Sequence, residues 1–208
     1  LCERPSEGVR GAAIVNIEQT IRSIVSVVNE AELQAGVKIQ QILVGVGGDH
    51  IEGISSQGVV GINAKDQEIK REDIFRSLEV ARAFEMPLDR EILHTLVQDF
   101  KVDGRSGIKD PIDMLAHRPE SRVLVVTASN PITQNVRKCI QRSGYQVQRL
   151  FAQQLADAEA VLSVEEREMG TILINLGDGT SNMIVYSNGS PVFTGGVNLG
   201  GSHITGDI

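Results

Sequence analysis

A glycine-rich turn between two apolar segments is the part of the sequence best suited to chemistry. It reads Asn175-Leu176-Gly177-Asp178-Gly179-Thr180-Ser181-Asn182. Phosphate is bound where backbone N–H groups converge, and Gly177 and Gly179 allow the positive dihedral angles and close approach that this requires. The Thr180 and Ser181 hydroxyls add donors that can reach phosphate oxygens or a water of a bound Mg²⁺. The turn predicts one half of a nucleotide-phosphate clamp, although an ordinary hairpin would also explain its Asp-Gly pair.

A second glycine pair, Gly200-Gly201, follows the strands that come after this turn. Two adjacent glycines let the backbone pass close to a ligand, so the pair is a candidate for the other wall of the same site. A simple surface loop is the alternative explanation.

The composition limits the classes of protein to which the chain can belong. The chain has 208 residues, 41% of them hydrophobic, so it can bury a core as one large or two modest domains. Its net charge of −7 argues against nucleic acid or an anionic membrane surface as the main partner. Cys2 and Cys139 are far apart and form no CxxC motif, which gives no support for a disulfide framework or a zinc site and favours a reducing, cytoplasmic setting.

Helical and strand patterns alternate along the chain, which predicts an α/β fold with a small α+β subdomain inserted in it. Helices are expected from Asn16, as N-cap, to Gly36, and over 71–84, 131–143 and 155–162. Strands are expected at 37–46, 58–62, 91–103, 122–127, 147–151, 171–176, 181–186 and 192–194, with 37–46 and 171–176 buried. A boundary is expected near Gly170.

Three stretches resemble the FtsA family, the actin-like bacterial cell-division proteins of the sugar kinase, Hsp70 and actin superfamily. The first is Leu43-Val44-Gly45-Val46-Gly47-Gly48-Asp49-His50-Ile51, and the third runs from Val161 to Gly170. The second is the most specific and consists of 89–94, 98–100, 102–104 and Gly107-Ile108-Lys109-Asp110-Pro111. The likeness spans nearly the entire chain.

The resemblance implies an incomplete actin-like ATPase fold, related to ribonuclease H. Residues 1–50 and 127–169 would be parts of subdomain 1A, 51–126 the inserted subdomain 1C, and 170–208 the start of subdomain 2A. No counterpart of the family's first phosphate loop, adenosine-binding segments, FtsZ-binding subdomain 2B or C-terminal membrane helix is recognised. The chain is therefore expected to be a fragment that does not hold a nucleotide by itself.

The glycine turn corresponds to the family's second phosphate loop, which implies that Gly177, Asp178, Gly179, Thr180, Ser181, Gly200 and Gly201 bind ATP with Mg²⁺ in the full-length protein. Asn175 stands where the family has an aspartate that holds a metal-bound water, so only weak metal binding through water is expected. Asp178 and Asn182 are also departures, and the Asp178 carboxylate would repel phosphate. Gln153 aligns with the residue that orients the attacking water, although an exposed glutamine at a helix start is an alternative.

The implied function is a cell division scaffold that self-associates and links the FtsZ ring to the cytoplasmic membrane, with weak or absent ATP hydrolysis. Subdomain 1C would serve self-association and contacts with later division proteins, and the protein would lie at the inner face of the membrane at the division site. The alternatives are an active ATPase or phosphotransferase of the same superfamily, and a protein-binding module like the type IV pilus protein PilM.

The remaining charged and histidine residues are expected to be structural or solvated. His50, His94, His117 and His203 show no metal-ligand spacing. Lys109-Asp110 and the run from Glu165 to Glu168 are interpreted as solvated surface groups.

Overall fold

The computed structural model describes residues 1–62 and 67–206. Residues 63–66 and 207–208, which belong to the predicted segments 51–126 and 170–208, lie outside the described residues. The helices are α1 (Ile17–Ala35), α2 (Arg71–Arg82), α3 (Asn130–Arg142), α4 (Gln153–Val161), α5 (Val164–Met169) and α6 (Gly201–Gly206). The strands are β1 (Val9–Arg10), β2 (Ala13–Ile14), β3 (Gln41–Val46), β4 (Glu52–Val59), β5 (Arg90–Val102), β6 (Arg105–Ile108), β7 (Pro119–Ser129), β8 (Gln146–Ala152), β9 (Thr171–Leu176), β10 (Ser181–Ser187) and β11 (Ser190–Val197).

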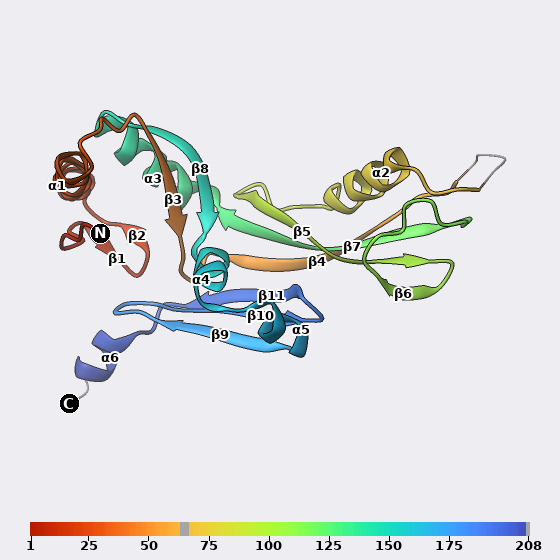
Figure 1. The fold of residues 1–208 in the computed structure, drawn as a ribbon. Helices are drawn as coiled ribbons and strands as arrows, with labels where there is room; N and C mark the ends of the chain where they lie inside the picture. Colours follow the sequence, from red (N-terminus) through yellow and green to blue (C-terminus); the bar gives the residue numbers. More distant parts are fainter. Residues whose placement is uncertain (63–66, 207–208) are drawn as a thin grey trace.

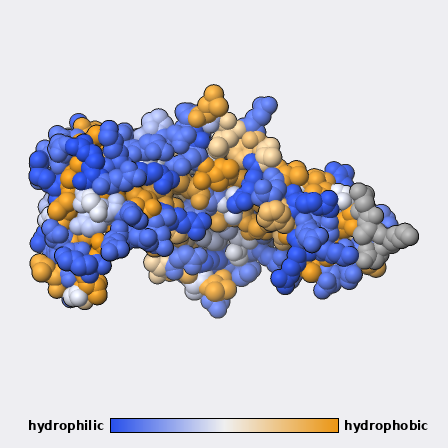
Figure 2. Space-filling model, turned by 90° about the horizontal axis from the view of Figure 1, so that it is seen from above, coloured by the Kyte–Doolittle hydropathy of each residue, from blue (hydrophilic) through white to orange (hydrophobic). Residues whose placement is uncertain are grey.

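These elements form three groups in an elongated molecule (Figure 1). One group contains the parallel pair β3-β8 beside α1 and α3. The second is a sheet in the order β4-β7-β5-β6, with α2 packed on it, that extends away from the first. The third is the antiparallel meander β11-β10-β9, which lies beneath the other two. Seen from above, the surface is mostly hydrophilic, and apolar side chains gather around the middle of the molecule (Figure 2).

Helix α1 has the ends that the sequence predicts. The Asn16 side chain accepts a hydrogen bond from the Gln19 N–H at 3.1 Å, and Gly36 ends the helix with a φ of 68°. Both signals are local, since an N-cap oxygen satisfies a free N–H of the first turn and glycine adopts positive φ without strain. The prediction for this helix is confirmed.

The inserted sheet differs from the prediction in two places. Strand β4 covers Glu52–Val59 rather than 58–62, because it pairs along its whole length with β7, from Glu52 opposite Thr127 to Val59 opposite Glu120. Strand β6 was not predicted; it is short and lies at the sheet edge beside β5. Pairing with a neighbouring strand overrides the weak β propensity of the Ser55-Ser56-Gln57 segment.

Two strands predicted to be buried are not. Strand β9 lies at the edge of its sheet and alternates half-buried with exposed residues, so that Ile172, Ile174 and Leu176 are exposed. In β3, Leu43 is exposed as well. The prediction was wrong because apolar content alone does not show whether both faces of a strand are covered.

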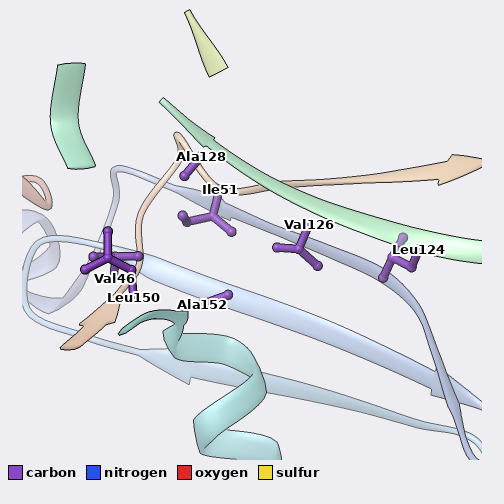
Figure 3. Close-up of a cluster of buried hydrophobic side chains, with 7 residues drawn as sticks. All are labelled: Val46, Ile51, Leu124, Val126, Ala128, Leu150 and Ala152. Carbon is purple, nitrogen blue, oxygen red and sulfur yellow. The ribbon is translucent and has the colours of Figure 1, made fainter. Parts of the chain in front are cut away.

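One buried cluster connects the first two groups of elements and fixes the position of the end of β3 (Figure 3). It consists of Val46, Ile51, Leu124, Val126, Ala128, Leu150 and Ala152. Because these side chains come from β3, β7, β8 and the turn after β3, their burial holds the backbone of Gly47 and Gly48 in one position.

Two sets of charged residues are not simply solvated. The Lys109 ammonium donates to the carbonyls of Asn188 at 2.6 Å and Gln98 at 3.3 Å, and to the Ser190 hydroxyl at 2.9 Å, which ties the inserted sheet to the β10-β11 hairpin. The run from Glu165 to Glu168 lies in helix α5, where Ser163 and Glu166 cap each other and Arg167 pairs with Glu159. Lys109, Asp110, Glu165, Glu166 and Glu168 are exposed, as expected of solvated surface groups, and tertiary contacts additionally supply partners to Lys109.

An ion pair inside the inserted sheet makes its stability depend on pH. The Arg122 guanidinium donates to the buried Asp99 carboxylate and, together with the Gly107 N–H, lowers the pKa of that carboxyl below its usual value. A lowered folded-state pKa stabilises the fold above the unfolded value of about 3.9, and this contribution is lost as the pH falls through the folded-state pKa.

We therefore expect Asp99→Asn to lower the free energy of unfolding by about 1 to 2 kcal/mol at neutral pH. Urea unfolding at a series of pH values measures this. The free energy of unfolding of the variant should lie below that of the wild type by a constant amount down to about pH 4, and the difference should shrink at lower pH. A difference that grew in acid would contradict the assignment.

Candidate functional site

The glycine turn joins β9 to β10 as a tight hairpin. Leu176 pairs with Ser181 at the ends of the two strands, and the Gly177 N–H donates to the Thr180 carbonyl at 2.9 Å. The backbone N–H groups of Asp178, Gly179 and Thr180 donate to no other protein group within residues 1–62 and 67–206. Three consecutive N–H groups at this turn are thus available to an anion, although Gly177 and Gly179 do not take the positive φ that was expected of them.

The second glycine pair lies directly against this turn. The Gly201 N–H donates to the Gly177 carbonyl and the Ser202 N–H to the Asp178 carbonyl, both at 2.9 Å. A Cβ atom on Gly200 would lie 2.4 Å from each of these carbonyl oxygens, so only glycine fits there. The structure thus brings together the two glycine segments, which are separated by some twenty residues in the sequence.

A polar cavity of about 800 Å³ opens beside the turn. Its walls are Asp178, Gly179 and Thr180, then Asn198, Ser202 and His203, and finally the β1-β2 hairpin with Arg10 and Gly11. The hairpin was not predicted, although Gly8 and Gly11 take φ values of 78° and 53°, as turn glycines do. Arg10, which is exposed, adds a cation to the lining of the same cavity.

The two hydroxyls of the turn differ in what they can still bind. The Ser181 hydroxyl donates to the Leu199 carbonyl at 2.6 Å, so its proton is already used. The Thr180 hydroxyl receives a long hydrogen bond of 3.5 Å from the Asn182 amide and keeps its own proton. Thr180 is therefore the hydroxyl available to donate to a ligand.

Asn182 connects the turn to the end of β3. Its side chain is 3% exposed, and its Oδ1 accepts from the Gly48 N–H at 2.8 Å and from the Gln154 Nε2 at 3.3 Å. From the sequence, Asn182 is recognisable only as a departure from the pattern that the resemblance implies. Its partner Gly48 is 134 residues away, so no local pattern could have indicated this contact.

Gln153 begins helix α4, as the alternative interpretation expects, but it is half-buried rather than exposed. It lines a second cavity of about 550 Å³ together with Gly47, His50 and Thr180. Its Oε1 would lie 2.8 Å from a Cβ atom on Gly47, so the glycine makes room for the glutamine side chain. Thr180 borders both cavities and links Gln153 to the glycine turn.

Asn175 lies on the face of β9 that is turned toward α4. Its Nδ2 donates to the Asp157 carboxylate at 2.7 Å. The carboxylate that the family has at position 175 is therefore absent, but another one lies within hydrogen-bond distance of the amide that replaces it.

This contact makes Asn175→Asp an informative change. Two carboxylates in contact repel each other, so we expect the free energy of unfolding at neutral pH to fall by about 1 to 2 kcal/mol. Adding Asp157→Asn in the same chain would remove the repulsion and restore the stability. Thermal unfolding of the single and double variants measures this. A single variant with the stability of the wild type would contradict the contact between Asn175 and Asp157.

The histidines form no metal centre. Among the described residues, no group of three or more His, Cys, Asp or Glu side chains could hold a metal ion. The His94 Nε2 accepts from the Ala152 N–H at 3.0 Å, and burial lowers the pKa of its ring. The His203 Nδ1 accepts from the Gly200 N–H at 3.1 Å, while the exposed His117 ring lies 3.6 Å from Asp103. The structural role expected for His94 agrees with these contacts.

Within the described residues, no helix is both long enough and apolar enough to cross a membrane.

The inserted sheet lies in the part of the chain that matches a known family. Residues 48–127 match the family described as the SHS2 domain inserted in FtsA. This stretch contains β4, α2, β5, β6 and most of β7.

Curated relatives match the chain over nearly its whole length. Cell division protein FtsA of Borreliella burgdorferi is 43% identical over 203 residues, which are 98% of this chain and 49% of that protein. The FtsA protein of Neisseria meningitidis is 39% identical over 208 residues, which are 100% of this chain and 50% of that protein. The chain thus spans about half the length of the relatives it matches.

A solved structure has the same fold. The PilM-PilN type IV pilus biogenesis complex matches with a TM-score of 0.63 at 13% identity, covering 99% of this chain and 55% of that one. The predicted mixed α/β fold with an inserted small domain is confirmed, and it is the fold shared with the PilM-PilN complex. The resemblance to the FtsA family is likewise confirmed over the whole chain, which corresponds to about half of such a cell division protein.

Proposed function

We propose that the chain is part of an actin-like, ATP-binding cell division scaffold with weak or absent hydrolysis. The observation that carries this proposal is the set of three backbone N–H groups at Asp178, Gly179 and Thr180, which have no partner in the described part of the chain and line a polar cavity together with Arg10. Such donors favour a chain of phosphates, and the Arg10 cation adds attraction.

Weak hydrolysis is supported by what the site offers to a metal. Mg²⁺ keeps several waters and is bound through one or two carboxylates plus substrate phosphates. Asn175 supplies only a neutral amide, whose Nδ2 is bonded to Asp157, so its Oδ1 could reach the ion only through water. Mg²⁺ would therefore be held chiefly by the nucleotide, and the Asp178 carboxylate beside the phosphates would weaken binding further.

The wider role in division is inferred from the relatives. In this proposal residues 1–50 and 127–169 are parts of subdomain 1A, 51–126 is subdomain 1C, and 170–208 begins subdomain 2A. Subdomain 1C would mediate self-association and contacts with later division proteins. Binding to FtsZ and to the inner face of the membrane would use segments of the full-length protein that are not in this chain.

The test is nucleotide binding by the full-length protein. Calorimetry with ATP and Mg²⁺ is expected to give saturable binding, and sedimentation with ATP is expected to recover filaments. Steady-state phosphate release is expected to be slow. Absence of ATP binding would reject the proposal, and fast turnover would replace it with the enzyme alternative.

Two specific observations support alternative functions. Gln153 lines the same cavity as Thr180, which favours an active ATPase or phosphotransferase, and Asn175→Asp would then raise turnover. The likeness to the PilM-PilN complex favours a protein-binding module instead. Capture of an FtsZ C-terminal peptide by the full-length protein would separate a division scaffold from such a module.

A further inference from the structure

Arg90 is a largely buried cation at the base of the inserted sheet, where β4 begins and β7 ends. Its side chain is 12% exposed. The guanidinium donates to the His50 carbonyl and to the Thr127 hydroxyl, each at 2.9 Å, and its Nη1 lies 3.2 Å from the Glu52 carboxylate. Since Arg90 is the first residue of β5, one side chain ties three segments of the inserted sheet together at its base.

The carbonyl that Arg90 binds belongs to the turn from Gly48 to Ile51, which connects β3 to β4. The Ile51 N–H closes this turn onto the Gly48 carbonyl at 3.2 Å, and the Ile51 side chain is fully buried in the cluster of Figure 3. Because Arg90 holds the turn at His50 and packing holds it at Ile51, the turn has one position relative to the inserted sheet.

The other end of this turn contacts the segments that surround the polar cavity beside the glycine turn. Gly48 has a φ of 108°, and a Cβ atom on it would lie 2.5 Å from the Cβ atom of Ala12 in the β1-β2 hairpin. Its N–H donates to the Asn182 Oδ1 at 2.8 Å, and its carbonyl oxygen would lie 2.7 Å from a Cβ atom on Gly196 in β11. Ala12 and Asn198, which follows β11, both line the cavity of about 800 Å³. The position of Gly48 therefore fixes how the two walls of the cavity are spaced.

We propose that Arg90 is a positioning residue for nucleotide binding, because it holds the turn that spaces the walls of a cavity that Arg90 itself does not line. This inference rests on the proposed nucleotide binding. Thermodynamic linkage makes the effect reciprocal: a nucleotide that requires this spacing also stabilises the turn and its contact with the inserted sheet. The inserted sheet and the nucleotide site are coupled in this way.

The experiment measures ATP binding with Mg²⁺ by calorimetry on the full-length protein. Arg90→Met keeps much of the side-chain volume and removes the hydrogen bonds of the guanidinium, and we expect it to weaken ATP binding about fivefold or more. Arg90→Lys keeps the charge but loses the planar fork that spans several partners, so it is expected to recover part of the loss. Amide hydrogen exchange gives the reciprocal measurement. At equal saturation, ATP is expected to slow exchange of the Ile51 amide in the wild type and to slow it less in Arg90→Met.

Arg82→Met is the matched control, because Arg82 is an arginine of α2 whose partners Glu79 and Thr95 belong neither to the turn nor to the cavity lining. It is expected to bind ATP as the wild type does, and an equal loss of affinity in both variants would overturn the proposal. Thermal unfolding without nucleotide separates a purely structural role. A lower unfolding temperature of Arg90→Met with unchanged ATP affinity would overturn the proposal while leaving the proposed function intact.

If Arg90→Met does not fold, Arg90→Lys is compared with the wild type in the same way, and wild-type ATP affinity in that variant would overturn the proposal. A wild-type protein that binds no ATP would overturn the proposed function together with this inference.

Discussion

Replacing Gly58 with alanine is expected to detach helix α2 from the inserted sheet. A Cβ atom at this position would lie 1.7 Å from the Ser77 carbonyl oxygen and 2.6 Å from the Ala81 nitrogen. Both are backbone atoms of α2, so no side chain can move aside, and the helix must shift away from β4. Ser77 and Ala81 are fully buried at this contact, and Ala81 belongs to a small core with Val123 and Val125. We expect a loss of about 3 kcal/mol in the free energy of unfolding.

Urea unfolding together with amide hydrogen exchange of α2 measures this effect. The matched control is Gly61→Ala, because a Cβ atom on Gly61 meets nothing within 4 Å and should leave the stability unchanged or slightly higher. If Gly58→Ala unfolded at the same urea concentration as the wild type, the packing of α2 on β4 would be wrong.

Asn182→Leu is expected to weaken both the fold and the binding of nucleotide. Leucine has a similar volume but accepts no hydrogen bond, so the buried Gly48 N–H and the Gln154 amide would lose their acceptor. Since each buried group left unsatisfied costs about 1 to 3 kcal/mol, the expected loss of stability is about 3 kcal/mol. Because Asn182 also contacts Thr180, the glycine turn would lose its connection to the end of β3.

The measurement pairs urea unfolding of the chain with ATP calorimetry of the full-length protein, where affinity should fall about tenfold. Asn182→Asp keeps an oxygen that accepts from Gly48 and Gln154 but adds a buried charge, so it should recover only part of the stability and little of the ATP affinity. A variant Asn182→Leu that kept wild-type stability and affinity would show that the network has no role in positioning the turn.

Local signals explain the parts of the fold that could be predicted. Helix α1 has an N-cap and a terminal glycine within its own segment, and helix α3 carries a proline in its first turn. The meander was recognisable because glycine and asparagine mark its turns. Strand β6 and the hairpin β1-β2 are too short to show a periodic pattern, and β4 is formed by pairing rather than by propensity.

In the candidate site, too, some features could be predicted from the sequence and others depend on tertiary contacts. The glycine turn and Gly200-Gly201 were identifiable as separate features, since glycines mark places where the backbone passes close to other atoms, as it does at Gly200; none of these glycines takes a positive φ. That they lie against each other, and that the Ser181 proton is used while that of Thr180 is free, depends on contacts with residues 198–202. His50 was expected to be structural or at the surface, and only the structure shows that it is buried beside the cavity that Gln153 and Thr180 also line.

The sequence by itself determined the elements with local signals, the glycine turn from Asn175 to Asn182 as a candidate phosphate loop, and the resemblance to FtsA. Only the tertiary structure decided which donors remain free, which carboxylate accompanies Asn175 and which distant residues meet at Asn182. The physical reason is that hydrogen-bond satisfaction and burial depend on atoms from all parts of the chain, whereas capping, turn formation and periodicity depend on a few neighbouring residues.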